Sequence, residues 1–558
     1  MQTPLNQVMN PTDEQRHEML RTALESDGRP EDYEYILRYL SPPPDITTYG
    51  FPGDLKGVKI GIIGGGLAGM SAAFELRKLG AEITILDASE DRIGGRVYTY
   101  YFDPEGNDYG EFGAMRIPVS HETTWYYINL FGLNTLSMTS PHCNNFHYVH
   151  NTRMRITESA PKYLYPNYDL TPQERNIPWQ ELSSYALEHS YRSLTPQVRS
   201  ELIQLLPNYS PDILPLMNMS LRKNFESLGL SQGAIQLISG ADPVSGALLH
   251  ISYDEIAQDN YTLDYQNTYR IDRGNANLPY AFYHSFFHAC PPQYGDISSS
   301  LLGTVTYRSG HHVTGIYQSD YRNKVVLRYR RANEPKVYAD IYDYVICAIP
   351  FSCLRTFEIK PYFSNQKMQS ILELNYIDAL KALYLFRRRF WEKDTEYGNI
   401  IGGISFTDLP IQSIIYPSDH HTDPVQGTYS PKESGVLTIY HLEQNYVRLG
   451  GLQSAMQYEL IRQNIEEVHG LPRGYLNNIL EQTAAVHWNS EPFSLGAMSL
   501  FLPGQKPQFA YENLKPEYHN RVYFAGEHVS NKHGWIQGAL SSGKGAANQL
   551  AYQHHSEL

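Results

Sequence analysis

Two hydrophobic patterns follow each other near the start of the chain. Residues 58–64 (VKIGIIG) form a nearly continuous apolar run that ends in glycine, which is typical of a buried parallel strand. Residues 67–79 repeat their apolar positions with the period of a helix, and residues 82–86 (EITIL) again have the pattern of a strand. The pattern predicts a strand–helix–strand unit of about thirty residues.

The segment before this unit has a different pattern. Residues 12–15 (TDEQ) form a capping box, which predicts the start of a helix with Leu20 and Leu24 on one face. Residues 41–44 (SPPP) predict an extended linker, because successive prolines exclude a helix. The first domain is therefore expected to begin after this linker.

Beyond the unit, helical and strand patterns alternate over long distances. Residues 123–249 are mostly helical in pattern, with proline-containing loops and no glycine-rich motif. Strand patterns return at residues 325–329 and 344–348, so we expect the first sheet to be completed by segments far apart in sequence. The 558 residues exceed what one hydrophobic core usually supports, and we expect two or three domains.

Composition and charge narrow the class of protein. The 45 basic and 59 acidic residues give a net charge of −14 without a run of Lys or Arg, which argues against nucleic acid and anionic membranes as partners. Hydrophobic residues make up 41% of the chain and tyrosine occurs 45 times, enough to bury cores and to line an aromatic pocket. We expect a folded, soluble protein.

Targeting signals and cysteine usage indicate a location. No apolar run approaches the roughly 20 residues that cross a bilayer, and residues 1–18 lack a basic start followed by an apolar stretch. We therefore expect a cytoplasmic protein that does not bind a membrane. Four cysteines without CxxC spacing fit a reducing compartment, namely Cys143, Cys290, Cys347 and Cys353.

A glycine-rich motif lies between the first predicted strand and helix. Residues 64–69 (GGGLAG) fit G-x-G-x-x-G, with Gly64 for the tight turn, Gly66 for close approach of a pyrophosphate and Gly69 for close helix packing. Asp87 ends the second strand, 18 residues after Gly69, where a carboxylate can accept hydrogen bonds from ribose hydroxyls and disfavours a 2′-phosphate. These residues predict a dinucleotide site, for either NAD or FAD, at the positive end of the helix.

The following segment favours one of the two dinucleotides. Residues 91–96 (DRIGGR) place Arg92, Gly94, Gly95 and Arg96 just beyond the ribose-binding acid. Guanidinium groups and bare backbone can meet phosphate oxygens there. A second phosphate-binding segment of this kind favours FAD, which stays bound to the protein.

Further motifs follow in a fixed order. They are residues 109–118 (YGEFGAMRIP), Lys381 ahead of 390–392 (FWE), 402–403 (GG), 407–410 (TDLP), 416–417 (YP), 524–527 (FAGE) and 533–536 (HGWI). Together with the dinucleotide motif, they make the chain from about residue 58 to residue 550 resemble the flavin-containing amine oxidase superfamily and, within it, the L-amino acid oxidases.

The resemblance implies an α/β fold: a Rossmann-like FAD-binding domain assembled from discontinuous segments, a mixed α+β substrate-binding domain and a helical insertion domain. The expected boundaries are 1–50 for an N-terminal helical extension and linker, 51–122, 298–356 and 496–558 for the FAD-binding domain, 123–249 for the helical insertion, 250–297 for a boundary segment between the substrate-binding and FAD-binding domains, and 357–495 for the substrate-binding domain.

The resemblance also implies roles for individual residues. Arg116 matches the family arginine that binds the substrate α-carboxylate, and a planar guanidinium can hold a carboxylate with two parallel hydrogen bonds. Tyr416 matches the tyrosine whose hydroxyl reaches the same carboxylate. Lys381 matches a lysine that holds a water near flavin N5, and it lies in an apolar run where an ammonium needs a partner. Trp535 is expected to wall the substrate, with Trp488 as a second aromatic residue beside the flavin.

The cofactor is expected to be FAD held without a covalent bond, because the C-terminal block has no cysteine where some amine oxidases attach the flavin. The histidines have no metal-ligand spacing, so we expect no metal site. The residues expected to contact FAD are Gly64, Gly66, Leu67, Ala68, Gly69, Asp87, Ala88, Gly94, Gly95, Arg96, Ala114, Met115, Arg116, Val313, Trp488, Gly526, Glu527, Gly534, Trp535 and Ile536.

The implied reaction is the oxidative deamination of an L-amino acid. Hydride passes from Cα to flavin N5, the imino acid hydrolyses to a 2-oxo acid and ammonia, and dioxygen reoxidises the flavin to give hydrogen peroxide. The partners are then a small L-amino acid and dioxygen, and relatives imply a homodimer or a larger homo-oligomer. The many aromatic residues favour aromatic or apolar side chains. A basic side chain would need an acid at the end of the pocket, for which the unranked candidates are Glu226, Asp242, Asp254 and Glu255.

Three alternatives differ in chemistry. An amine oxidase without carboxylate recognition is disfavoured by Arg116 and its motif. An amide-forming amino acid monooxygenase shares the same flavin site and stays open. A non-catalytic flavoprotein that keeps FAD only for structure is disfavoured by the number of matching motifs.

Overall fold

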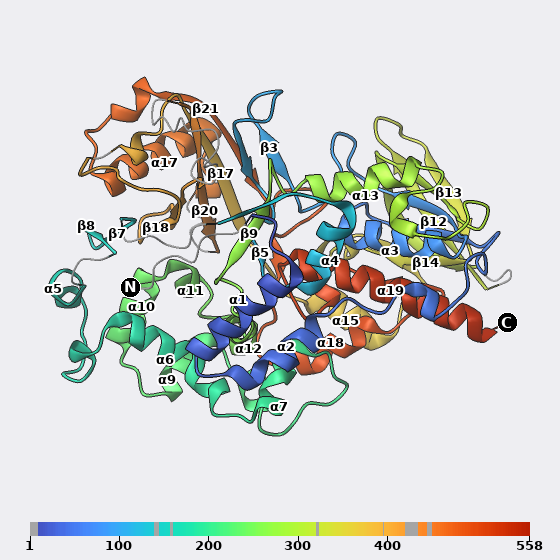
Figure 1. Cartoon of the computed structure of the whole chain (residues 1–558), viewed down its shortest axis with the longest axis horizontal. Coiled ribbons are helices and arrows are strands. Elements are labelled where there is room, and N and C mark those ends of the chain that lie inside the picture. Colours follow the sequence, from blue (N-terminus) through green and yellow to red (C-terminus); the bar gives the residue numbers. More distant parts are fainter. Residues whose placement is uncertain are drawn as a thin grey trace.

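The structure is a computed structural model of the chain, and it describes residues 9–138, 144–156, 160–319, 323–393, 395–418, 433–443 and 449–557. Figure 1 shows three parts: an α/β part that contains α3 and β14, a sheet part around β17, β20 and β21, and a layer of helices below both. Cys143 lies outside the described residues.

A five-stranded sheet forms the centre of the α/β part. Its order is β10-β2-β1-β14-β23, and all neighbouring strands are parallel. The strands predicted at residues 58–64, 82–86 and 344–348 are confirmed as members of this sheet. The sheet is completed by segments far apart in sequence, as expected. Its strands are β1 (Lys59–Ile63), β2 (Glu82–Leu86), β10 (Thr304–Arg308), β14 (Tyr344–Cys347) and β23 (Val522–Phe524).

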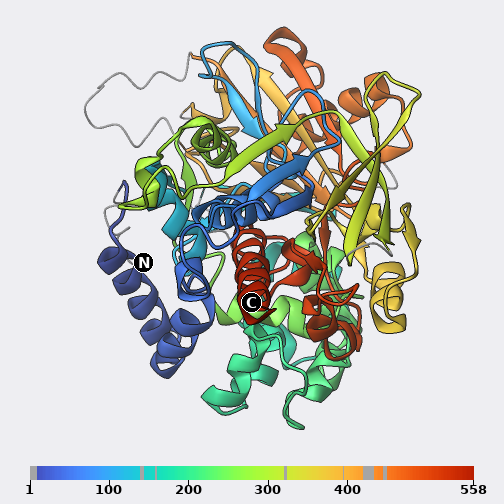
Figure 2. The same ribbon diagram turned by 90° about the vertical axis from the view of Figure 1, so that its right-hand side faces the viewer.

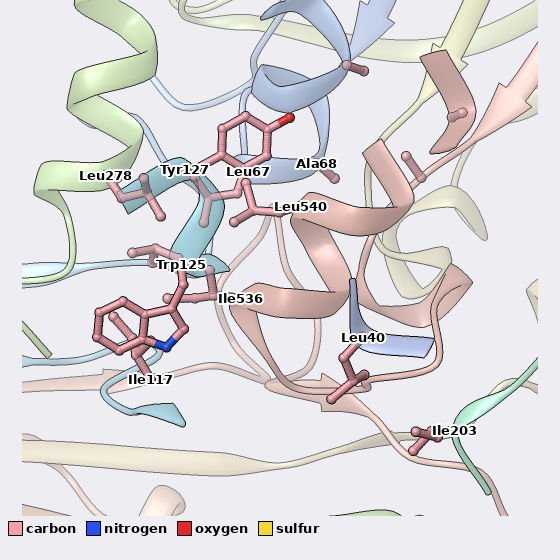
Figure 3. Packing of buried hydrophobic residues seen from close by; sticks show 14 of the residues in the cluster. Leu40, Leu67, Ala68, Ile117, Trp125, Tyr127, Ile203, Leu278, Ile536 and Leu540 are labelled. Carbon is pink, nitrogen blue, oxygen red and sulfur yellow. The ribbon is translucent and has the colours of Figure 1, made fainter. Parts of the chain in front are cut away.

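Helix α3 (Leu67–Lys78) and the C-terminal helix α19 (Ile536–Glu557) lie against each other beside this sheet. A Cβ at Gly543 would lie 2.1 Å from the Ser71 hydroxyl oxygen, so glycine permits the close approach of the two helices. Figure 2 shows α19 running through the centre of the molecule. Figure 3 shows the buried cluster that joins both helices to α4 (Glu122–Phe131), with Leu67, Ala68, Trp125, Tyr127, Ile536 and Leu540.

A second sheet, of order β13-β12-β11-β15, lies in the same part. It contains the strand predicted at residues 325–329, so the expectation that this strand completes the parallel sheet was wrong. The strands β11 to β13 are antiparallel, and β12 alternates buried and exposed residues, as in a sheet with one covered face. Its strands are β11 (His311–Ser319), β12 (Lys324–Arg331), β13 (Val337–Tyr342) and β15 (Glu358–Lys360).

The sheet part is built on seven strands in the order β21-β17-β20-β19-β18-β7-β8. β17 (Ala379–Phe386) is buried along its whole length between β20 (Gly435–Leu442) and β21 (Leu480–His487). The other elements of this part are β18 (Ile404–Thr407), β19 (Ser413–Ile415), β7 (Phe146–Val149), β8 (Thr152–Arg155) and α17 (Ser454–His469).

Residues 123–249 supply most of the helical layer, as their pattern predicts, but they also contribute β6 (Thr135–Ser137), β7 and β8 to two sheets. The domain boundaries given above stay a prediction. The helices of this layer are α6 (Trp179–Arg192), α7 (Pro196–Arg199), α8 (Leu214–Met217), α9 (Leu221–Ser227), α10 (Gln232–Ala241), α11 (Pro243–Ala247) and α12 (Tyr253–Tyr261).

The N-terminal capping box is confirmed. Helix α1 (Asp13–Ser26) begins after Thr12, whose hydroxyl accepts from the Gln15 N–H while the Gln15 side chain accepts from the Thr12 N–H. The next helix, α2 (Tyr33–Leu40), was not predicted from the sequence. The remaining elements used below are β5 (Ile117–Pro118), β9 (Thr268–Ile271) and α13 (Asn277–Phe287).

Candidate active site

A cavity of about 710 Å³ extends from the β1–α3 turn to the helical layer and the seven-stranded sheet. All but one of the residues predicted to bind FAD or substrate line it, although they come from segments spread over the whole chain. The exception is Gly69, which lies behind the wall. The predicted residues in the wall are Gly64, Gly66, Leu67, Ala68, Asp87, Ala88, Gly94, Gly95, Arg96, Ala114, Met115, Arg116, Val313, Lys381, Tyr416, Trp488, Gly526, Glu527, Gly534, Trp535 and Ile536.

The three motif glycines have different environments in the β1–α3 turn. Gly64 has a φ of +99°, and a Cβ there would lie 2.7 Å from Ile349 Cγ2. Gly66 precedes α3 without a side chain that caps the helix, which leaves the first amides of α3 to a ligand. A Cβ at Gly69 would lie 2.1 Å from the Gly64 carbonyl oxygen, so this glycine lets α3 pack closely on β1.

Asp87 lies where β2 ends and is 8% exposed. Its carboxylate accepts hydrogen bonds from the Gly65 N–H (2.7 Å), the Ser89 N–H (2.8 Å) and the Tyr307 hydroxyl (2.9 Å). Burial raises the pKa of this carboxyl, and these hydrogen bonds oppose the rise. Tyr307 was not predicted from the sequence, because only the pairing of β10 with β2 brings it to Asp87.

Arg96 and Glu527 form an ion pair in the cavity wall. Arg96 Nη1 lies 2.7 Å from Glu527 Oε1, and the 5% exposed carboxylate also accepts from the Ser499 hydroxyl (2.7 Å) and the Gly534 N–H (2.9 Å). Burial alone would raise the pKa of Glu527, but Arg96 holds it down at about 2. Glu527 therefore positions the Arg96 guanidinium, which is predicted to contact phosphate.

We expect Glu527→Gln to destabilise the folded protein by about 3 kcal/mol, because it leaves the Arg96 guanidinium without its counter-ion. The pKa of Glu527 falls from 4.5 to about 2 on folding, so its contribution to stability is complete above pH 4.5 and is lost as the pH falls towards 2. Chemical denaturation at several pH values measures this. Glu358→Gln, which breaks an exposed ion pair with Arg328, is the control and should change stability little. Equal losses in both variants would contradict the assignment.

Arg116 precedes β5 and lines the cavity. Within the described ranges, no residue forms a hydrogen bond or an ion pair with its guanidinium, and its Cζ lies 5.9 Å from the centre of the Tyr265 ring. Burial lowers the pKa of Arg116, and the neighbouring Tyr265 and Tyr440 oppose this change. A partly buried guanidinium without a counter-ion is costly, so this one is suited to a ligand carboxylate.

Lys381 reaches the same cavity from β17. It is 5% exposed, and its Nζ donates to the Gly113 carbonyl (2.5 Å) and lies 4.9 Å from the centre of the Tyr440 ring. The pairing of β17 with β20 sets Lys381 directly opposite Tyr440. Burial lowers the pKa of Lys381 to about 7, and the carboxylate of Glu111 opposes this change. The ammonium can therefore gain or lose a proton near neutral pH.

Tyr416 lines the cavity, but its hydroxyl is bonded inside the protein, and its role at the substrate carboxylate stays a prediction. Its hydroxyl donates to Ser405 Oγ (2.9 Å) and lies 2.9 Å from His469 Nε2, and the side chain is 3% exposed. The ring also packs in the buried cluster of the sheet part, and both hydroxyl partners belong to that part. Tyr265 and Tyr440, which the sequence analysis missed, are the tyrosines beside Arg116.

The two predicted tryptophans have different contacts. The Trp535 indole N–H donates to Asp259 Oδ1 (3.2 Å), and its ring lies 5.9 Å from that of Tyr265. The Trp488 N–H donates to the Phe112 carbonyl (2.9 Å), and the side chain is 3% exposed. Trp535 is thus the tryptophan linked to the surroundings of Arg116.

Of the four acids that were candidates for binding a basic side chain, two line the cavity and two do not. Asp242 and Glu255 line the cavity. Asp254 pairs with Lys506 inside the protein (3.5 Å), and Glu226 lies on α9 outside the cavity wall. The apolar share of the wall near the helical layer is large, with Met138, Trp179, Leu187, Val244, Leu248, Ile404, Phe406, Ile415 and Leu442.

Three further observations concern metals, membranes and disulfides. Across the described ranges, no three His, Cys, Asp or Glu side chains gather as metal ligands. None of the helices described here has the length and apolarity to cross a bilayer. Cys290, Cys347 and Cys353, the three described cysteines, are not paired with one another.

The cavity fits FAD on its own geometry. The glycine turn leaves room that a Cβ would fill, the start of α3 offers amides to a pyrophosphate, and Asp87 can accept from a ribose. Residues of the C-terminal block continue the same wall towards Lys381 and Arg116. The residues that would hold FAD are therefore those of the β1–α3 turn, Asp87, the 94–96 segment and the C-terminal block.

Comparison with known proteins agrees with this geometry. L-amino acid oxidase Cdc18 of Crotalus durissus cumanensis is 26% identical over 532 residues, which cover 95% of this chain and 96% of the relative. The L-amino-acid oxidase of Echis ocellatus is 27% identical, with 95% of each chain covered. Among solved structures, putrescine oxidase bound to putrescine has a TM-score of 0.64 at 14% identity, covering 88% of this chain and 98% of its own.

Cyclohexylamine oxidase from Brevibacterium oxydans IH-35A has a TM-score of 0.63 at 17% identity, covering 89% of this chain and 99% of its own. At these identities the two structures support the fold alone, and they agree with the expected α/β arrangement. The sequence pattern of the family described as flavin containing amine oxidoreductase matches residues 67–551. The chain therefore belongs to the flavin-containing amine oxidoreductase family and is an FAD-dependent oxidoreductase.

Proposed function

We propose that the chain is an L-amino acid oxidase that removes hydride from Cα of an L-amino acid and yields a 2-oxo acid, ammonia and hydrogen peroxide. The observation that carries this proposal is the Arg116 guanidinium, which lines the cavity without a protein partner among the described residues. An amine without a carboxylate would leave this partly buried cation uncompensated. The curated relatives named L-amino-acid oxidase support the same reaction.

The chain's own residues would bind and orient the substrate. Arg116 would hold the α-carboxylate with a forked hydrogen bond, and Tyr265 and Tyr440 stand beside it. Lys381 would hold and exchange protons on water at the site. FAD, held without a covalent bond, supplies the two-electron acceptor and its reoxidation by dioxygen. This arrangement fixes the direction of the Cα–H bond.

We propose aromatic or apolar side chains as the preferred substrate class. The wall between the helical layer and the seven-stranded sheet is rich in apolar residues, for example Trp179, Leu248 and Phe406. Burying such a side chain there stabilises the complex by about 25 cal/mol per Å² of apolar surface. The expected homo-oligomer and the cytoplasmic location stay predictions.

The proposed reaction is tested with the FAD-loaded protein. Each of the twenty L-amino acids is mixed with it without oxygen, and the loss of flavin colour is recorded. Reduction by aromatic or apolar amino acids, followed in air by equal yields of peroxide and ammonia, is the expected result. Failure of every amino acid to reduce the flavin would overturn the proposal, and a shortened amide product would assign a monooxygenase instead. Denaturation should release free FAD if the cofactor is held without a covalent bond.

We expect Lys381→Met to slow the reaction with dioxygen or the hydrolysis of the imino acid by about tenfold or more, because it removes the proton-exchanging ammonium from the cavity. Substrate binding should change by less than about threefold, since Lys381 donates to the Gly113 carbonyl and the variant keeps Arg116. Stopped-flow measurement of the two half-reactions separates these effects. Unchanged rates of both half-reactions and of product release would contradict the role.

A further inference from the structure

Helix α12 places a carboxylate in the cavity wall that the reaction described above does not use. Asp259 Oδ1 accepts from Lys532 Nζ (2.9 Å) and from the Trp535 indole N–H (3.2 Å), and Oδ2 accepts from the Tyr265 hydroxyl (3.3 Å). The Asp259 side chain keeps 17% of its surface accessible, and it lines the cavity. It is therefore held firmly while one side remains open to a ligand.

The charges behind Asp259 do not cancel. Lys532 is fully buried and pairs with both Asp259 and Asp264. His121 lies 3.2 Å from Asp264, and burial lowers its pKa, although Asp264 opposes this, so the ring is neutral at pH 7. Two carboxylates thus share one ammonium, and the group carries one net negative charge when both are ionised.

The adjacent ion pair does not supply the missing positive charge. His533 Nδ1 lies 3.1 Å from Glu255 Oε2, and this carboxylate raises the pKa of His533 although burial opposes it. A histidine that pairs with a carboxylate has no positive charge to spare for Asp259. Within the described part of the chain, the negative charge at Asp259 faces the cavity without a further basic partner.

The opposite charge, on Arg116, lies near the same tyrosine. The Tyr265 ring lies 5.9 Å from Arg116 Cζ, while its hydroxyl donates to Asp259. Around Tyr265 the cavity thus presents a cation that has no partner among the described residues and a carboxylate with excess negative charge. An α-amino acid in water is a zwitterion with a carboxylate and an ammonium on one carbon, and the two sites match these groups in sign.

We propose that Asp259 is a catalytic residue: its carboxylate binds the α-ammonium of a substrate held by Arg116 and takes one of its protons. This inference rests on the proposed amino acid oxidation. In the step, an N–H bond of the ammonium breaks and an O–H bond forms on Asp259, giving a neutral amine and a neutral carboxylic acid. The amine then has the lone pair that hydride loss from Cα requires, which an ammonium lacks.

The groups around Asp259 favour this transfer. Burial raises the pKa of Asp259 to about 7, Lys532 opposes the rise and Asp264 adds to it. Arg116, which faces the same substrate, disfavours a second positive charge and lowers the pKa of the bound ammonium. Trp535 and Tyr265 keep the carboxylate in place by their hydrogen bonds. The pKa of the Asp259 carboxyl and the pKa of the bound α-ammonium are therefore brought closer together.

The binding test uses two ligands that cannot be oxidised. α-Methyl-L-phenylalanine has no hydrogen on Cα, and 2-methyl-3-phenylpropanoate is the same molecule without the amino group. We expect the FAD-loaded wild-type protein to bind the amino compound about tenfold or more tightly in calorimetry at pH 7, because only it reaches Asp259. Equal affinities for the two ligands would overturn the proposal without any variant.

The variants are Asp259→Asn and Asp259→Glu. In Asp259→Asn, the preference for the amino compound should disappear, and the pH at which flavin reduction becomes fast should rise by about one unit or more. Asp259→Glu keeps a carboxylate, so it should restore much of the preference for the amino compound and of the wild-type pH profile. Melting temperature and FAD content report folding. An Asp259→Asn protein with wild-type ligand preference and pH profile would overturn the assignment.

Two other failures can be told apart from this one. If no L-amino acid reduces the flavin of the wild-type protein, the proposed function fails, and the ligand comparison then stands alone. If Asp259 served a basic side chain instead, Asp259→Asn would lose activity towards lysine and arginine only. It would keep its preference for α-methyl-L-phenylalanine, and that result would also overturn the proposal.

Discussion

Arg116→Ala should lower kcat/KM for L-amino acids by more than about a hundredfold while FAD remains bound. One hydrogen bond to a charged group contributes about 1.5–3 kcal/mol, and a guanidinium can offer two to a carboxylate, so a loss of about 3 kcal/mol or more is expected. Arg116 forms no hydrogen bond or ion pair with the residues described here, so its loss should not unpair another group in the protein. The effect should therefore appear in catalysis and not in folding.

The comparison substrate is the amine that lacks the carboxylate, 2-phenylethylamine beside L-phenylalanine. Arg116→Ala should reduce the preference for L-phenylalanine and leave the slow reaction of the amine nearly unchanged. Arg116→Lys keeps the positive charge but cannot form the forked hydrogen bond. Its preference for L-phenylalanine should lie between those of the wild type and Arg116→Ala. Steady-state kinetics, with FAD content and melting temperature as controls, measure this. An unaltered preference for the carboxylate would remove Arg116 from the substrate site.

Features encoded by near neighbours in sequence were predicted well. The capping box of α1 depends on Thr12 and Gln15 alone, and the strand–helix–strand unit depends on apolar periodicity within 29 residues. The glycine motif lies within this unit, so its position could be predicted too. Such features follow from backbone hydrogen bonds and local sterics, which a short window of sequence contains.

Features that depend on strand pairing were not predictable in the same way. Residues 325–329 have the pattern of a strand, but nothing in that pattern tells whether β12 joins the parallel sheet or a separate antiparallel one. Tyr416 lines the cavity, but its hydroxyl bonds to Ser405 and His469, which only the folding of the seven-stranded sheet and α17 brings to it. The position of Tyr416 in its motif therefore could not predict the hydrogen-bond partners of its hydroxyl.

The candidate site shows the same division. Arg116 and Lys381 were identified through motifs, and the fold brings both to one cavity. Tyr440 was missed because its place beside Lys381 comes from the register of β17 and β20. Asp259 was missed because its excess charge depends on Lys532 and Asp264, which only tertiary packing brings together. Charge balance among distant residues has no signature in one sequence.

Two glycines of one motif should respond to alanine in opposite ways. In Gly66→Ala, the new Cβ would meet no protein atom closer than 4.0 Å, and the backbone φ of −77° suits any L-residue. The protein without FAD should therefore keep its stability. The same methyl group would stand where the backbone must approach a pyrophosphate, so FAD affinity should fall by about a hundredfold or more. FAD titration of the apoprotein and its thermal melt measure the two effects separately.

Gly69→Ala is the matched variant, because it adds the same methyl group three residues further along the chain. Its Cβ would lie 2.1 Å from the Gly64 carbonyl oxygen and 3.1 Å from Ile62 Cγ2, so α3 must move away from β1. Overpacking of this kind costs about 1–3 kcal/mol, and the apoprotein should melt at a lower temperature. FAD binding should weaken only as a consequence of this movement. If Gly66→Ala bound FAD as the wild type does, the β1–α3 turn would not be the pyrophosphate site. If Gly66→Ala destabilised the apoprotein as Gly69→Ala does, the free space at Gly66 would be contradicted.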